Sequence, residues 1–341
     1  MARDHTAKAH DAIPRSFGEA AAAKDGPVVN EHSFEGRVAV VTGAGRGIGR
    51  AYAVLLASRG ASVVVNDLGG SLDGVGEDAG VASGVATDIV GTGGAAIADA
   101  SDVSTPEGGR SLVEAAVERF GRLDILVNNA GIIRWAGLPE ADTENLASHL
   151  AVHVLGSFNT ARAAWPHMVD QRYGRIVMTT SSGLFGLPKN LAYATAKGGV
   201  IGLARSLATA GAAHGIKVNL IAPGAVTRMA GQAAETGPSG GAASPWMSPD
   251  LVAPMVGFLA HESCPVSGEI YAAGFGRFSR IFIASTEGYV HATPEPTIED
   301  VARHWATIND ETGYYVPTDL MAWSAAFMSH LPPSGGDSVA P

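Results

Sequence analysis

The 341-residue chain has almost no cysteine, few aromatic side chains and no long apolar run. Its one cysteine, Cys264, excludes an intramolecular disulfide and a thiolate metal cluster, and we expect no metal site. No apolar stretch reaches the ~18 residues of a membrane span, and the polar N-terminus lacks the apolar segment of a secretory signal. The sequence therefore predicts a cytoplasmic protein without a membrane span.

Positive charge is also scarce, because 23 Lys and Arg stand against 33 Asp and Glu, a formal net charge of -10. This balance argues against a nucleic-acid surface, although a local basic patch could still bind an anionic substrate. The chain is rich in apolar residues, which make up 46% of it, and it contains 44 glycines. The apolar content suffices for a sizeable core and excludes global disorder.

Strand-like and helix-like patterns alternate from Arg37 onward. Val38 to Val41 is a β-branched run suited to a strand buried on both faces, and a helical stretch over 49–58 ends at a glycine C-cap signal. The alternation continues to a last expected strand at 268–272. With short connections between the elements, this pattern predicts a doubly wound α/β domain with a mainly parallel sheet.

The composition also divides the chain into regions. We expect a flexible tail over 1–32, which is polar and lacks apolar periodicity, the folded domain over 33–285, and an extension of open role over 286–341. A stretch rich in Ala, Gly, Ser and Pro at about 229–249 is longer than a connector needs to be. It suits a lid over a ligand, with a plain surface loop as the alternative.

A glycine-rich turn between the first strand and the first helix has the spacing Gly-x3-Gly-x-Gly. Gly43 permits the tight turn, Gly47 lets the backbone approach a diphosphate, and Gly49 lets helix and strand pack closely. The diphosphate would meet free N–H groups at the helix N-terminus, around Arg46 and Ile48. The turn follows a strand and opens a helix, so it predicts a dinucleotide site.

Asp67 ends the second expected strand, about 20 residues after the turn. A carboxylate there can accept both ribose hydroxyls of the adenosine half and would repel a 2′-phosphate. Arg46 favours the opposite choice, because a guanidinium can pair with a 2′-phosphate. The carboxylate meets the hydroxyls directly, so we expect NAD, with NADP as the less favoured cofactor.

Turns after the later strands are further candidates for contact with the same cofactor. Simple turn or helix-capping chemistry is the alternative for each of them. They are an acid and its neighbour after the third strand, an Asn-Ala-Gly turn after the fourth, and a Pro-Gly turn further on: Asp102, Val103, Asn129, Ala130, Gly131, Pro223, Gly224, Val226 and Thr227.

Tyr193 and Lys197 lie one helical turn apart on one face of the expected helix that follows the fifth strand. A free phenol titrates near pH ~10, but a nearby ammonium and an oxidised nicotinamide both favour the phenolate. Lys197 can also hold the hydroxyls of the nicotinamide ribose. Beside a dinucleotide, the pair predicts an acid/base that moves a proton while a hydride moves.

These motifs together resemble the short-chain dehydrogenase/reductase family over about 37–280. The resemblance implies a single Rossmann-like domain with a seven-stranded parallel sheet, usually in a homodimer or homotetramer. It also implies that Tyr193 is the acid/base, that Lys197 is its ribose-binding and pKa partner, and that Asn129 contacts the cofactor.

The chain departs from the family pattern at two positions. The residue that polarises the substrate oxygen, usually serine, falls at Thr180, with Ser181 as the fallback. The proton-relay asparagine falls at His153, which could relay protons or could equally be a packed helix residue.

A narrower resemblance is to the dehydrogenase unit of peroxisomal multifunctional enzyme type 2 and its bacterial stand-alone relatives. The segments that carry it are 43–45 with 49–53, 64–70, 156–165 and 261–264. It implies a 3-hydroxyacyl-CoA substrate, as in fatty-acid or steroid side-chain β-oxidation, and agrees with NAD. One alternative is a dehydrogenase of hydroxysteroids or other secondary alcohols. Another is a nucleotide-binding protein without catalysis.

Overall fold

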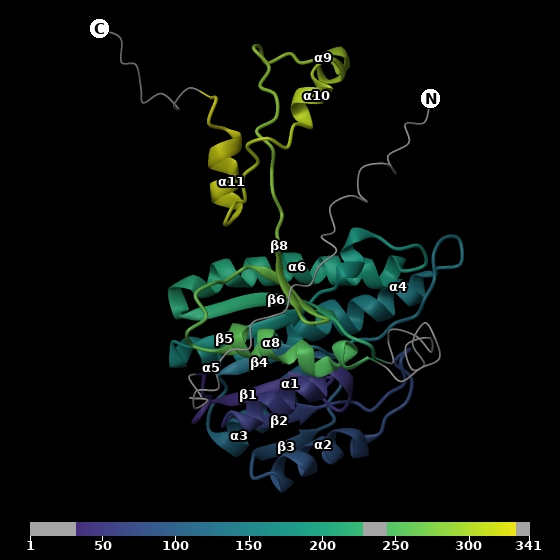
Figure 1. Ribbon diagram of the computed structural model, residues 1–341, viewed down its shortest axis with the longest axis vertical. Coiled ribbons are helices and arrows are strands. Elements are labelled where there is room, and N and C mark those ends of the chain that lie inside the picture. Colours follow the sequence, from purple (N-terminus) through teal and green to yellow (C-terminus); the bar gives the residue numbers. More distant parts are fainter. Residues whose placement is uncertain (1–31, 228–243, 332–341) are drawn as a thin grey trace. The chain divides into compact units, whose positions relative to one another are not determined.

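The computed structural model describes residues 32–227 and 244–331 (Figure 1). The expected tail lies outside the described residues except for His32, and so does most of the expected lid. The extension is described as far as Leu331. None of the helices in the described part of the chain combines the length and apolar character needed to cross a bilayer.

The strands of the described residues form one sheet in the order β3-β2-β1-β4-β5-β6-β7-β8. Strands β1 to β7 pair in parallel, and β8 pairs antiparallel with β7. The doubly wound α/β prediction is therefore confirmed, and the expected seven strands become eight. The bounds are β1 Val38–Thr42, β2 Ser62–Asn66, β3 Ala95–Asp99, β4 Ile125–Asn128, β5 Gly174–Thr179, β6 Ile216–Gly224, β7 Ile270–Gly274 and β8 Arg277–Ile281.

Helices cover both faces of the sheet (Figure 1). In β1, Ala39 and Val41 pack with residues of α1, α2 and α8, whereas Val38 and Val40 pack with residues of α3, α5 and α6. This alternation is the period of a strand buried on both sides. The longer helices are α1 Gly47–Ser58, α2 Ala79–Gly91, α3 Pro106–Phe120, α4 Thr143–His149, α5 Gly156–Gln171, α6 Leu191–Gly211 and α8 Ala253–Ala260.

The helical stretch between β4 and β5, 143–171, contains an irregular turn. It comprises α4, a π-helical segment at Leu150–Leu155, and α5. A π-helical turn inside an α-helix changes which side chains point inward, and such turns are frequent at functional sites. Here the segment carries His153, whose side chain is buried.

Beyond the sheet, the described extension forms three short helices, α9 Ile298–Arg303, α10 Trp305–Ile308 and α11 Leu320–Phe327, none of which has a buried residue. It is tied to α6 through Arg205, whose guanidinium donates to the Pro317 and Thr318 carbonyls.

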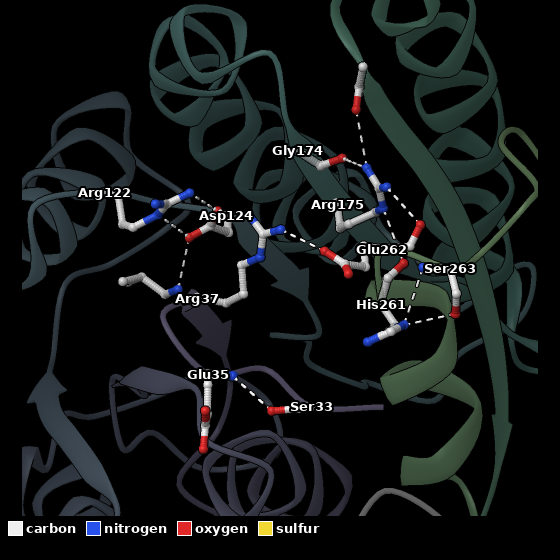
Figure 2. Close-up of polar contacts among 12 residues, drawn as sticks. Ser33, Glu35, Arg37, Arg122, Asp124, Gly174, Arg175, His261, Glu262 and Ser263 are labelled. Carbon is white, nitrogen blue, oxygen red and sulfur yellow. Dashed lines mark hydrogen bonds and ion pairs between the residues drawn. The ribbon is translucent and has the colours of Figure 1, made fainter. Parts of the chain in front are cut away.

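A charged network joins elements at the edge of the sheet where β1, β4 and β5 begin (Figure 2). Asp124 is fully buried, and its carboxylate accepts from Arg37 at 3.0 Å, from Arg122 at 2.6 Å and from the Val38 N–H at 3.0 Å. Arg37 also pairs with Glu262 at 2.8 Å. This edge is opposite to the carboxyl ends of the strands, where ligands bind in doubly wound folds, so we assign the network to stability.

Candidate active site

A cavity of about 510 Å³ lies at the carboxyl ends of the strands. Its walls come from the glycine-rich turn after β1, the loop after β2, and the segments after β3 and β4. This is the place where doubly wound sheets bind nucleotides. The predicted cofactor residues that line it are Gly43, Arg46, Gly47, Ile48, Gly49, Asp67, Asp102, Val103, Asn129, Ala130, Gly131 and Thr227.

The glycine-rich turn has no room for side chains at its two ends. A Cβ on Gly43 would lie 2.8 Å from the Ala130 Cα, and one on Gly49 would lie 2.1 Å from the Gly43 carbonyl oxygen. A Cβ on Gly47 would make only ordinary contact with Thr227, at 3.6 Å, but the φ of Gly47 is +53°, which favours glycine. Gly47 is also exposed, so the N-terminus of α1 is accessible to an anion.

Asp67 already holds two backbone groups. One carboxylate oxygen accepts from the Gly45 N–H at 2.9 Å, and the other accepts from the Gly69 N–H at 2.8 Å. A Cβ on Gly45 would lie only 2.9 Å from the same carboxylate. The glycine turn is thus built around Asp67, and the sequence reasoning missed this role of Gly45.

Asn129 fastens the end of β4 to the glycine-rich turn. Its amide donates to the carbonyls of Thr42 and Gly43 at 3.0 and 3.1 Å, and the Thr42 hydroxyl accepts from the N–H groups of Asn129 and Ala130. Asn129 therefore shapes the cavity as well as lining it.

The carboxylate of Asp102 accepts a hydrogen bond from the Ser104 N–H at 2.9 Å, an arrangement typical of a turn.

Three predicted cofactor residues after β5 do not line this cavity. Pro223 and Gly224 belong to β6, and a Cβ on Gly224 would lie 2.8 Å from the Phe275 ring. The Val226 N–H donates to the Met247 carbonyl at 3.0 Å. Their expected contact with the nicotinamide amide stays a prediction.

Tyr193 and Lys197 both lie on α6, and the Lys197 ammonium is 5.6 Å from the centre of the Tyr193 ring. Lys197 is buried and donates to the Thr179 carbonyl at 2.7 Å. Burial lowers the pKa of Lys197 to about 7. Burial also raises the pKa of Tyr193, and a hydrogen bond with Ser181 partly offsets this rise. The phenol therefore has a hydroxyl partner in place.

Ser181, and not Thr180, is the hydroxyl beside the phenol. The Thr180 side chain is fully buried, and its hydroxyl donates to the Lys197 carbonyl at 2.9 Å. Ser181 is partly exposed, accepts from the Gly183 N–H at 3.0 Å, and lies close to the phenol ring, because a Cβ on Gly183 would lie 3.3 Å from Ser181 Oγ and 3.7 Å from Tyr193 Cε1. The geometry therefore favours the fallback residue over the one chosen by spacing.

His153 is packed behind Tyr193. The two rings are 5.4 Å apart and nearly perpendicular, and a Cβ on Gly131 would lie 2.4 Å from His153 Cε1. His153 Nε2 lies 2.9 Å from the Ile132 carbonyl, and Nδ1 is buried with no partner among the described residues. Burial and nearby Lys197 hold the pKa of His153 well below its usual value, so the ring is neutral.

Several cavity residues were not predicted from the sequence. They lie in the loop after β2 and on the far side of the cavity: Leu68, Gly70, Ser71, Leu72, Asp73, Gly74, Ile132, Arg134, Ser148, Ala151 and Val152. The one signal for the loop was its richness in glycine and aspartate directly after a strand that ends in Asp67.

The residues present fit a nicotinamide dinucleotide. An accessible helix N-terminus at the glycine-rich turn and a carboxylate at the end of β2, both lining one cavity, are features such a cofactor needs. No cluster of potential metal ligands occurs among the described residues.

Comparison with known proteins gives the class and then the family. The family model of short chain dehydrogenases matches residues 37–237. The chain belongs to the short-chain dehydrogenase family. It is therefore an oxidoreductase, and its family binds nicotinamide nucleotides.

Individual relatives support the assignment. A short-chain type dehydrogenase/reductase of Mycobacterium tuberculosis is 40% identical over 81% of this chain and 95% of its own length. The peroxisomal multifunctional enzyme type 2 of Mus musculus is 39% identical over 90% of this chain, but the match spans only 41% of that protein.

Solved structures give the same fold. A short chain dehydrogenase from Mycobacterium avium has a TM-score of 0.70 and 33% identity, and the match covers 81% of this chain and 97% of that one. Full-length peroxisomal multifunctional enzyme type 2 from Drosophila melanogaster has the same score and identity, with 87% and 49% covered.

Proposed function

We propose that the protein is an NAD-dependent dehydrogenase that interconverts a 3-hydroxyacyl-CoA and its 3-oxo form. The observation that carries the chemistry is the position of Tyr193, with the Ser181 hydroxyl on one side and the buried Lys197 ammonium 5.6 Å from its ring centre. Tyr193 takes the proton of the C3 hydroxyl, and Ser181 polarises that oxygen. When bound, the nicotinamide supplies the hydride acceptor. Lys197 orients the ribose and favours the phenolate.

Asp67 supports NAD over NADP. Its carboxylate lines the cavity with two backbone N–H groups already bound, so it is fixed in place, and a fixed carboxylate repels a 2′-phosphate. Arg46 donates to the Gly70 carbonyl at 3.3 Å, which draws part of its hydrogen-bonding capacity into the protein. We expect a homodimer or homotetramer in the cytoplasm.

The acyl-CoA substrate rests on similarity to the multifunctional enzymes, of which this chain matches only one part. The test is absorbance at 340 nm with NAD, or with NADP as the comparison. The panel holds (3R)- and (3S)-hydroxyacyl-CoA esters of short and long chains, a steroid side-chain ester and a free 17β-hydroxysteroid. Activity confined to the CoA esters supports the proposal, because remote binding energy is then used in catalysis. Activity with the free steroid alone would replace it by a hydroxysteroid dehydrogenase.

The variant Tyr193→Phe tests the assigned mechanism. General acid/base loss should lower kcat at least ~10²-fold. A folded variant with near wild-type turnover would refute the assigned chemistry. If the wild-type protein turns over none of the substrates in the panel but still binds the dinucleotide, the chain is a nucleotide-binding protein without catalysis.

A further inference from the structure

The loop between β2 and α2 is organised, although its glycine-rich sequence resembles a simple connector. We call residues 68–76 the strap. At its tip the Ser71 N–H and hydroxyl both donate to the Val75 carbonyl at 2.9 Å, and the Ser71 hydroxyl accepts from the Val75 N–H at 3.0 Å. A tip closed by hydrogen bonds from both directions keeps a defined shape.

The strap crosses from one side of the cavity to the other. It leaves β2, and its tip contacts the segment that follows β4: the Ile133 N–H donates to the Leu72 carbonyl at 2.9 Å, and Arg134 Nε donates to the Asp73 carbonyl at 3.1 Å. In the sheet, β1 lies between β2 and β4. The strap therefore passes over the carboxyl end of β1, where the glycine-rich turn lies.

Two histidines are hydrogen-bonded to the segment after β4, residues 132–134, that the strap contacts. His153 Nε2 contacts the backbone of Ile132, and His149 Nε2 accepts from the Arg134 N–H at 3.3 Å. The two imidazole rings are stacked, 5.8 Å apart and within 12° of parallel. Both rings are buried, so they attach this segment to α4 and to the π-helical turn although it lies outside the sheet.

Because strap residues and the glycine-rich turn line the same cavity, a dinucleotide in that cavity lies between them. We infer that the strap closes over the bound cofactor and must lift from Ile133 and Arg134 before the cofactor can enter or leave. This inference rests on the proposed function, which places the dinucleotide there. It assigns 68–76 and Arg134 a role in cofactor retention.

The structure offers a reversible way to hold the strap closed. A Cβ built on Gly74 lies 3.9 Å from Ile132 Cβ, within the usual range for two cysteines in a disulfide. The only native cysteine, Cys264, is buried and does not compete. The variant Gly74→Cys/Ile132→Cys can thus be compared with itself, oxidised and reduced, with the two single cysteine variants as controls.

The readout is NADH dissociation, measured by stopped-flow fluorescence as excess NAD displaces NADH. Oxidation of the loaded double variant should slow release at least a hundredfold, and reduction should restore it, whereas oxidation should change neither single variant. Unchanged release with the disulfide verified by mass would overturn the inference. Gly74 has a φ of +85°, where a cysteine is strained, so if the disulfide does not form the Arg134 variant described next decides the inference.

A second variant tests the opposite direction. Arg134→Leu removes a hydrogen bond from a charged donor to the strap tip and should speed NADH release about tenfold. Arg110→Leu, an exposed arginine on α3, is the matched control and should not change the rate. An unchanged rate in Arg134→Leu would also count against the strap. If the wild type binds neither NADH nor NADPH, the proposed function fails instead, so the two failures are distinguishable.

Discussion

The choice between Ser181 and Thr180 can be decided by two matched substitutions. Ser181→Ala removes the hydroxyl that lies close to the Tyr193 ring and lowers the pKa of the phenol. Loss of one donor to a reacting oxygen lowers kcat by about 10² to 10³. Thr180→Val instead removes a buried hydroxyl that donates to the Lys197 carbonyl, while the side-chain shape is kept. It should cost about 1 kcal/mol in the free energy of unfolding and leave kcat within a few-fold.

The pH profile adds a readout that a purely structural role would not change. The Ser181 hydrogen bond lowers the pKa of Tyr193, so its loss should move the ionisation of the free enzyme seen in kcat/KM to higher pH. The assay is initial-rate NADH formation from pH 6 to 10 with a 3-hydroxyacyl-CoA, alongside urea unfolding of each variant. A hundredfold loss in Thr180→Val with near wild-type Ser181→Ala would refute this reading of the site and restore the residue chosen by spacing.

Three further predictions concern buried charge. The pKa of Lys197 is about 7 in the folded state and ~10.4 in the unfolded state. The free energy of unfolding of the wild type should therefore rise, relative to that of Lys197→Met, as the pH increases between these two values. Urea titrations of both proteins at pH 7 and pH 9 measure this difference. The pKa of His153 is also depressed, so stability should fall as the pH drops below ~6.5, and less so in His153→Asn; equal acid sensitivity of the two proteins would contradict this. Asp124→Asn should lose about 3 kcal/mol of unfolding free energy, whereas Arg110→Ala, from an exposed ion pair, should lose under ~0.5 kcal/mol; similar losses would remove the distinction.

The sequence was sufficient to predict the elements whose side chains are buried on both faces. Val38 to Val41 forms a strand because its β-branched run packs into both cores, and the glycine-rich turn follows from steric limits at Gly43 and Gly49. Strand β8 was missed because it is an edge strand whose residues, Arg277 to Ile281, are mostly exposed. An exposed edge strand does not require an alternating apolar pattern, so its sequence does not predict a strand.

Within the site, spacing predicted the residue types but not the direction of each side chain. Thr180 and Ser181 directly follow β5, and the Thr180 side chain is buried whereas that of Ser181 is partly exposed, a difference that spacing alone does not predict. The π-helical turn around His153 and the strap depend on contacts between distant segments, such as Ile133 with Leu72. Local sequence patterns do not encode such pairings.

The two backbone hydrogen bonds of Asp67 limit how the proposed preference for NAD could be changed to one for NADP. In a simple picture, replacing the carboxylate with a small neutral residue would admit a 2′-phosphate. Here the same change would leave the N–H groups of Gly45 and Gly69 without their acceptor, loosening the glycine-rich turn and the root of the strap together. An NADP-specific version therefore needs a replacement such as Asn or Ser that still accepts a hydrogen bond, together with compensating changes in both loops.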